Sequence, residues 1–317
     1  MLVIGTEAGA YRISDSGEQL GSALDGMWFN EITPDGSGRL LASVRDNGVY
    51  VSTDDGETWR SVLDNVDAWT VAVSPTGTLY AGIQKGLYQS TSGGEEWEEL
   101  TGLQDLPTFE NWGFPLAPHV ANVHSLAFSH KDSDTIYAGV EVGGVIASSD
   151  RGKTWRDLRE GLHLDIHTLV SAPGNEDVLH AATGRGMFRS LDAGESWEAV
   201  NEGLESIYMI PAMIHPKDPQ VLFTAASQGR PRYWRREEGA DATMYRSKNG
   251  GDSWEPIMGG LTDRTHGLVM GFAADPDNDD TIYAGTSDGE VLVSRNLGDS
   301  WSTFTEGLPS IYCLTVV

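Results

Sequence analysis

The chain has few basic residues and is strongly acidic. Its 317 residues include 21 lysines and arginines, of which five are lysine, against 47 aspartates and glutamates, and the formal net charge is −26. Binding to a phosphate backbone needs clustered basic residues, so we expect no nucleic-acid partner. Excess charge of one sign repels itself at low ionic strength and is screened by salt. We therefore predict a halophilic source.

The chain also lacks paired cysteines and long apolar runs. Cys313, the single cysteine, lies in an apolar segment, where we expect a small buried side chain. No apolar run approaches the roughly 20 residues of a membrane-spanning helix. The first residues do not have the pattern of a secretory signal. We expect a cytoplasmic protein without membrane insertion, a monomer, and no cofactor.

One eight-residue turn, which we call a box, recurs along the chain. Its pattern is Ser-x-Asp-x-Gly-x-Thr/Ser-Trp at residues 52–59, 148–155 and 190–197. Copies with serine or asparagine in place of the aspartate occupy 90–97, 247–254 and 294–301, and a worn copy occupies 13–20. The aspartate or asparagine can accept hydrogen bonds from the following N–H groups, and the glycine permits a positive φ. The tryptophan begins the next strand and can cover the turn with apolar surface.

Each repeat also predicts four short strands. Before the box at 148–155, strand patterns occupy 124–128, 134–139 and 144–148, and the box tryptophan opens a fourth strand. Four strands per repeat are typical of a propeller blade. The first repeat lacks an inner strand, whereas a strand at 311–317 has no repeat of its own. We therefore predict that this C-terminal strand joins the N-terminal blade, which removes an exposed edge.

The predicted fold class is all-β: a seven-bladed β-propeller of four-stranded antiparallel blades, with residues 1–317 as a single domain. A six-bladed ring is the alternative if the worn copy at 13–20 is decorative. That alternative would leave the C-terminal strand without a partner.

The boxes resemble the Asp-box, or bacterial neuraminidase, repeat, whose pattern is Ser-x-Asp-x-Gly-x-Thr-Trp. The resemblance covers nearly the whole chain. It implies a propeller similar to those of sialidases, the sortilin lumenal domain, xyloglucan-cleaving glycosidases and photosystem II assembly factor-like proteins. Because these proteins differ in function, the resemblance implies the fold and leaves the function open.

The boxes mark one face of the ring, so function is expected on the other face, where loops can vary. Two insertions fall on that face, at 101–120, which includes Trp112, and at 227–242. The second insertion is basic and aromatic and contains Arg230, Arg232, Tyr233, Trp234 and Arg235. Together with Arg45 and Arg185 it predicts a positive mouth for a carboxylate, a phosphate or an acidic polymer. The alternative is that these arginines pair with neighbouring glutamates and pin the loop.

A second pattern lies near the start of the innermost strands. Alignment of the repeats places seven aromatic or imidazole residues at equivalent positions: Trp28, Trp69, His124, His167, Tyr208, His266 and Tyr312. Such a ring around the axis could stack on a sugar, hold a small anion, or bind a metal through His124, His167 and His266. These histidines come from different blades and have no local ligand spacing. Packing is the rival explanation, because amphipathic rings often finish a core.

Enzymatic activity has less support in the sequence. The segment Tyr11-Arg-Ile-Ser is similar to the arginine motif of sialidases, but Arg12, Arg189 and Arg246 all precede a box at the same strand position. This periodicity favours a role in the repeat. A glycosidase needs two carboxyl groups about 5–10 Å apart, and the weak candidates are Glu31, Glu110, Asp165 and Asp263. The xyloglucan-cleaving enzymes that the chain resembles place their site between two propellers, and this chain has one.

We therefore expect a non-catalytic binding or assembly module. It would use the face opposite the boxes to bind an anionic or carbohydrate ligand or a protein partner. The alternative is a sialidase-like or xyloglucanase-like glycoside hydrolase with paired carboxylates on the same face.

Overall fold

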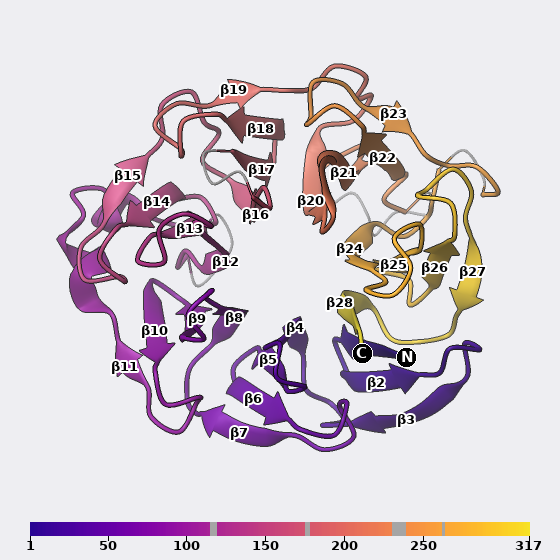
Figure 1. Ribbon diagram of the computed structural model, residues 1–317, viewed down its shortest axis with the longest axis horizontal. Coiled ribbons are helices and arrows are strands. Elements are labelled where there is room, and N and C mark those ends of the chain that lie inside the picture. The colour runs from indigo at the N-terminus through magenta and orange to yellow at the C-terminus, as the bar shows by residue number, and fades with distance from the viewer. Residues whose placement is uncertain (115–118, 175–177, 230–238, 262–263) are drawn as a thin grey trace.

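Seven four-stranded antiparallel sheets stand around a central axis as the blades of a propeller (Figure 1). The computed structural model describes residues 1–114, 119–174, 178–229, 239–261 and 264–317. The predicted seven-bladed, all-β fold is confirmed. The worn box at 13–20 belongs to a complete blade, so the six-bladed alternative is wrong.

The strands of each blade run in order from the axis outward. Blade 1 contains β28 (Ile311–Val316), β1 (Leu2–Thr6), β2 (Gly9–Ile13) and β3 (Gln19–Ala23). Blade 2 contains β4 (Phe29–Pro34), β5 (Leu40–Val44), β6 (Gly48–Ser52) and β7 (Arg60–Leu63). Blade 3 contains β8 (Ala68–Val73), β9 (Leu79–Ile83), β10 (Gly86–Ser90) and β11 (Glu98–Glu99). Blade 4 contains β12 (Val123–Phe128), β13 (Ile136–Val140), β14 (Gly144–Ser148) and β15 (Arg156–Leu158).

The remaining three blades follow the same order. Blade 5 contains β16 (Ile166–Ser171), β17 (Leu179–Thr183), β18 (Gly186–Ser190) and β19 (Glu198–Ala199). Blade 6 contains β20 (Tyr208–His215), β21 (Asp218–Ser227), β22 (Thr243–Ser247) and β23 (Glu255–Pro256). Blade 7 contains β24 (Val269–Ala274), β25 (Ile282–Thr286), β26 (Val291–Ser294) and β27 (Ser302–Thr305).

The two ends of the chain close the ring (Figure 1). Strand β28 pairs antiparallel with β1, with Leu2 opposite Val316. The N-terminal ammonium donates a hydrogen bond to the carbonyl oxygen of Val317 at 3.1 Å. The C-terminal strand is therefore the innermost strand of blade 1, as predicted, and the N-terminal strand has no free edge.

Hydrogen bonds within each turn hold the boxes in shape. In the box at 52–59, one carboxylate oxygen of Asp54 accepts the backbone N–H of Thr58 at 2.9 Å, and the other accepts its hydroxyl at 2.6 Å. The Ser52 hydroxyl accepts the N–H of Gly56, which has a φ of 80°. A Cβ on Gly56 would lie 2.9 Å from Val3 of the preceding blade, so close approach as well as backbone angle requires glycine.

The hydrophobic core lies between neighbouring blades. Seven clusters of buried residues each join two adjacent blades, for example Val3 of blade 1 with Phe29 of blade 2. Six boxes contribute a tryptophan to the cluster shared with the preceding blade, such as Trp59 beside Phe29 at a ring-centroid distance of 5.7 Å. The tryptophan was expected to cover its own turn, and it also joins two blades.

Arginines on the outer strands connect the same neighbours. Arg246 donates to Glu255 of its own blade and to Asp299 in the next box, both at 2.7 Å. Arg189 makes the equivalent contacts with Glu198 and Asp252, both at 2.6 Å. These pairs confirm the structural role inferred from the periodicity.

The first insertion forms two short 3-10 helices, η1 (Thr101–Asp105) and η2 (Phe109–Asn111), which pack on blades 3 and 4. Trp112 is 3% exposed and lies in the core cluster, 5.1 Å from the ring of Phe109. Trp112 was predicted to contact a ligand, but its burial makes it a packing residue instead. No helix within the described parts of the chain has the length and apolar character needed to cross a membrane.

Candidate functional site

A cavity of about 1090 Å³ lies at the axis of the ring. The innermost strand of every blade contributes to its wall, and the connections that carry Arg45, Glu141 and Asp165 form its rim. These connections join the second strand to the third or one blade to the next, so they emerge opposite the boxes. We call this side the loop face and the other the box face.

The side chains that enter the cavity are placed by a repeated irregularity. In five blades the pairing between the first and second strands skips one residue near the start of the first strand: Asn30, Trp69, His124, His167 and Met270. Tyr312 is skipped in the same way in blade 1. All six line the cavity. A bulge re-aims a side chain, and here it turns one residue per strand toward the axis.

Aromatic and imidazole rings form a continuous arc along the rim. Neighbouring ring centroids lie 4.8 Å apart for Trp28 and Tyr312, 5.5 Å apart for Trp69 and His124, and 5.1 Å apart for His167 and Tyr208. The ring nitrogen Nδ1 of His124 lies 2.8 Å from the carbonyl oxygen of His167, which joins the second pair to the third. Six of the seven predicted ring residues therefore line one cavity.

Arg45 joins the first pair of rings to the second and so completes the arc. Its guanidinium carbon lies 4.1 Å from the ring centroid of Trp28 and 4.2 Å from that of Trp69, so the guanidinium packs against both indole rings. Asp67 holds the arrangement by accepting the indole N–H of Trp69 at 2.9 Å and the backbone N–H of Asp46 at 3.1 Å. Burial lowers the pKa of Arg45, and the charge of Asp67 opposes this shift.

Two carboxylates and a histidine meet on the next part of the rim. Ligand atoms of Glu141, Asp165 and His167 all lie within 4.8 Å of one another. The His167 Nε2 atom lies 3.6 Å from Asp165 and 3.4 Å from the Tyr208 hydroxyl. Burial alone would lower the pKa of His167, but Asp165, the Met209 carbonyl and Glu141 together raise it. Burial lowers the pKa of neighbouring His124, so the pKa values of the two histidines shift in opposite directions.

Glu31 lines the deeper wall of the cavity. Its carboxylate accepts hydrogen bonds from the Thr70 hydroxyl and from the Val71 N–H at 3.1 Å, which joins blade 2 to blade 3. Burial raises the pKa of Glu31 in spite of these bonds. Glu31 and Asp165 are thus the two predicted carboxyl candidates that reach the cavity.

The structure places other predicted residues elsewhere. His266 is 61% exposed, contacts Asp288 at 2.6 Å and is absent from the cavity wall, so the set of three histidines does not form a metal site. Glu110 lies on η2 and is exposed. The remaining predictions fall outside the described residues: Arg230, Arg232, Tyr233, Trp234, Arg235 and Asp263.

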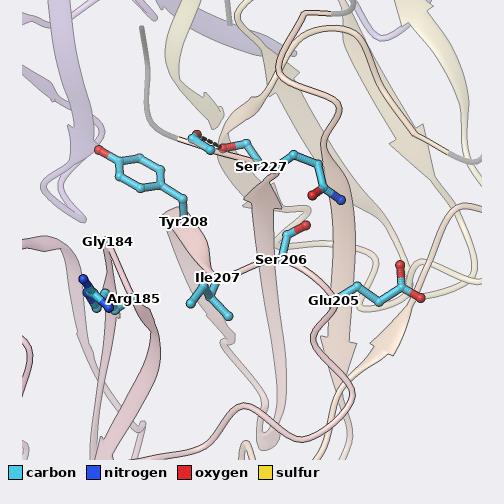
Figure 2. Close-up of a pocket in the computed structure, with 9 residues that line it drawn as sticks. Gly184, Arg185, Glu205, Ser206, Ile207, Tyr208 and Ser227 are labelled. Carbon is cyan, nitrogen blue, oxygen red and sulfur yellow. Dashed lines mark hydrogen bonds between the residues drawn. The ribbon is translucent and has the colours of Figure 1, made fainter. Parts of the chain in front are cut away.

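Arg185 lines a second, smaller pocket of about 290 Å³ on the loop face. Figure 2 shows Arg185 and Tyr208 on one side of this pocket and Glu205 at the opposite end, with Ile207 between them. Ile207 is 45% exposed, although it is a large apolar residue. Tyr208 belongs to both pockets, so the two openings are adjacent.

Sequence reasoning missed Asn30, Glu141 and Met270. Alignment by residue type chose Trp28 in blade 2 and His266 in blade 7, whereas the bulge positions are Asn30 and Met270. Glu141 follows the second strand of blade 4 just as Arg45 follows that of blade 2. An alignment of these strand ends would have found Glu141.

Two family profiles match the chain. One, described as "Sortilin, neurotensin receptor 3", matches residues 143–263, and the BNR/Asp-box repeat matches residues 50–61. The chain is a seven-bladed Asp-box β-propeller.

Curated relatives of this Asp-box propeller differ in function. It is 25% identical over 166 residues to vacuolar protein sorting/targeting protein 10 of Arthroderma otae, covering 51% of the chain and 11% of that protein. It is 24% identical over 265 residues to a xyloglucanase of Hypocrea jecorina, covering 74% of the chain and 25% of the enzyme. It is 23% identical over 285 residues to photosystem II assembly lipoprotein Ycf48 of Synechococcus sp., covering 80% of each. The Asp-box propeller thus spans a quarter or less of the first two relatives.

Solved structures share the fold. The GH74 enzyme of Niastella koreensis matches with a TM-score of 0.68 at 16% identity, over 95% of the chain and 46% of that enzyme. YCF48 bound to D1 peptide matches with a TM-score of 0.60 at 14% identity, over 96% of the chain and 84% of that protein. At these identities the likeness extends to the propeller fold alone.

Proposed function

We propose that this Asp-box propeller is a binding module that takes an anionic or carbohydrate ligand, or an exposed segment of a protein partner, into the axial cavity from the loop face. The observation that carries the proposal is the arc of rings around Arg45 that lines one cavity, four of which lie at bulges. Pockets lined by aromatic side chains with a few convergent polar groups are typical of ligand sites. A relative of similar length is an assembly protein, which agrees with a binding role.

The test is calorimetric titration with xyloglucan oligosaccharides, uronate oligosaccharides and short acidic peptides. Trp69→Ala should weaken the binding of the active compound by about tenfold or more, because the substitution removes a stacking surface and one side of the Arg45 sandwich. Leu191→Ala is the control, since Leu191 is 58% exposed in a box on the opposite face. Equal affinities for the Trp69 variant and the native protein would disprove the cavity as the site.

A glycoside hydrolase is the second candidate. Two carboxyl groups, Glu31 and Asp165, line the same cavity, and the raised pKa of Glu31 caused by burial suits a general acid. Release of reducing ends from xyloglucan, lost in both Glu31→Gln and Asp165→Asn but retained in Glu110→Gln, would favour this candidate. We favour the binding role because Glu31 is already engaged by Thr70 and Val71.

A further inference from the structure

Arg45 differs from Arg189 and Arg246, the arginines that join neighbouring blades on the box face. Across the described residues its guanidinium makes no hydrogen bond and no ion pair, and its Nε atom is buried without a partner. An unsatisfied buried donor is unfavourable, especially on a charged group. With a net charge of −26 the chain has many carboxylates that could pair with Arg45, yet none of those described does. Arg189 and Arg246 each have two carboxylate partners.

We propose that the edge of the Arg45 guanidinium recognises a carboxylate group of a sugar that occupies the axial cavity. This inference rests on the proposed binding function of that cavity. Trp28 and Trp69 both pack against the guanidinium, and Arg45 also lines the axial cavity, so a ligand in the cavity can reach the remaining N–H groups. A planar guanidinium binds a planar carboxylate edge to edge through two parallel N–H···O bonds. Stacking fixes the plane, so little side-chain freedom is lost when the ligand binds.

The surrounding charges disfavour a ligand with two negative charges. Asp46, Asp67 and Glu141 all act on Arg45 electrostatically. A phosphate monoester carries nearly two negative charges at neutral pH and would be repelled by these three groups. A carboxylate carries one charge, which Arg45 can balance.

The walls beside Arg45 favour a sugar ring as the body of the ligand. Tyr312 and His124 extend the stacking surface on the two sides of the Trp28 and Trp69 sandwich. Farther along the rim, Glu141 and Asp165 present acceptor oxygens of the kind that sugar hydroxyls need. The combination of stacking surface, acceptors and one cation matches a hexuronate.

Calorimetric titration with galacturonate and glucuronate trimers and with their methyl esters tests this assignment. Esterification removes the charge and keeps the sugar. The native protein should bind an acid form about tenfold or more tightly than its ester. Arg45→Gln should abolish this preference, and Arg45→Lys should keep part of it because the charge remains while the planar fork is lost. Arg295→Gln is the matched control, since Arg295 is exposed on the box face and pairs with none of the described residues, and its preference should equal that of the native protein.

Each contrary result has a distinct meaning. Equal binding of acid and ester, or an unchanged preference in Arg45→Gln, would overturn the carboxylate site and leave the binding function of the cavity in place. Binding of short peptides in preference to their C-terminal amides, with no uronate bound, would overturn the sugar assignment. Failure of every sugar and peptide to bind would overturn the proposed function as well. Near-ultraviolet circular dichroism of each variant verifies its fold, and Arg45→Lys carries the test if Arg45→Gln does not fold.

Discussion

The two faces of the propeller differ in the partners that they give to an arginine side chain. On the box face, Arg246 is 3% exposed and bonded to two carboxylates from two blades. On the loop face, Arg45 is half-buried between Trp28 and Trp69 and has no carboxylate partner among the described residues. Arg189 and Arg246 on the box face are satisfied within the protein, so they stabilise the ring. A polar group left unsatisfied on the loop face marks a place where a ligand can complete the contacts.

The largest effect that tests this contrast is expected for Arg246→Gln. The substitution removes the cation that joins blades 6 and 7 and leaves the carbonyl oxygen of Leu297 without its donor. Loss of a buried charge pair costs about 3–5 kcal/mol, and the exposed carboxylate partners reduce this to roughly 2–3 kcal/mol. Denaturant unfolding measures the loss. Arg295→Gln, in the neighbouring box, should change the free energy of unfolding by less than about 0.5 kcal/mol, and equal losses would contradict the structural role of Arg246.

The next-largest effect concerns unfolding by acid. Carboxyl groups on the two faces should change the free energy of unfolding in opposite directions as the pH falls. Hydrogen bonds from the side chain and backbone of Thr58 lower the pKa of Asp54 to about 2, and equivalent bonds lower the pKa values of Asp150 and Asp192. Their pKa values in the folded state lie below the unfolded value of about 3.9. The stabilisation is therefore complete above pH of about 4 and is lost as pH falls toward about 2. Burial raises the pKa of Glu31, so its contribution changes in the opposite direction.

The triple variant Asp54→Asn, Asp150→Asn and Asp192→Asn isolates this contribution, because asparagine already serves in the boxes at 247–254 and 294–301. Unfolding midpoints measured from pH 5 to about 2 should fall less steeply in the variant than in the native protein. Identical slopes would show that the boxes do not control acid stability.

A substitution in a single box should lower the free energy of unfolding by a smaller amount. Asp54→Ala removes two hydrogen bonds to Thr58, and the loss of a comparable cap destabilises a protein by about 1 kcal/mol. Asp54→Ser should lose less, because Ser92 in the equivalent position still accepts the N–H of Glu96 at 2.8 Å. Chemical denaturation of both variants gives the comparison. An alanine variant as stable as the native protein would mean that the box turn holds its shape without the aspartate.

The fold could be predicted because every blade carries its own local signal. The box pattern is set by turn chemistry within eight residues, and seven copies leave one strand, 311–317, whose place only ring closure can provide. The core was harder to predict in detail. In the sequence, Trp112 cannot be told from an exposed aromatic residue, because its burial depends on how η1 and η2 pack on blades 3 and 4.

The candidate site could be predicted only in outline. Aromatic and imidazole residues at strand starts indicated the cavity wall, and six of the seven lie there. The exact positions depend on a bulge, and a one-residue irregularity redirects side chains in a way that residue type alone does not reveal. Thus Asn30 and Met270 were missed and His266 was included. Equally, only three-dimensional packing shows that Arg45 is sandwiched and has no partner among the described residues, while Arg264 is bonded to Glu205.

Arg45→Gln should have a small effect on stability, and this sharpens the comparison with Arg246→Gln. The substitution removes two contacts with tryptophan rings, each worth about 0.5–1 kcal/mol at partly exposed sites. It also removes the buried, unpartnered Nε atom, which offsets part of that loss. The free energy of unfolding should therefore change by less than about 1 kcal/mol, well below the change in Arg246→Gln. If both variants lose the same amount in denaturant unfolding, Arg45 holds the ring together as Arg246 does, and the two faces do not differ in the way that their contacts indicate.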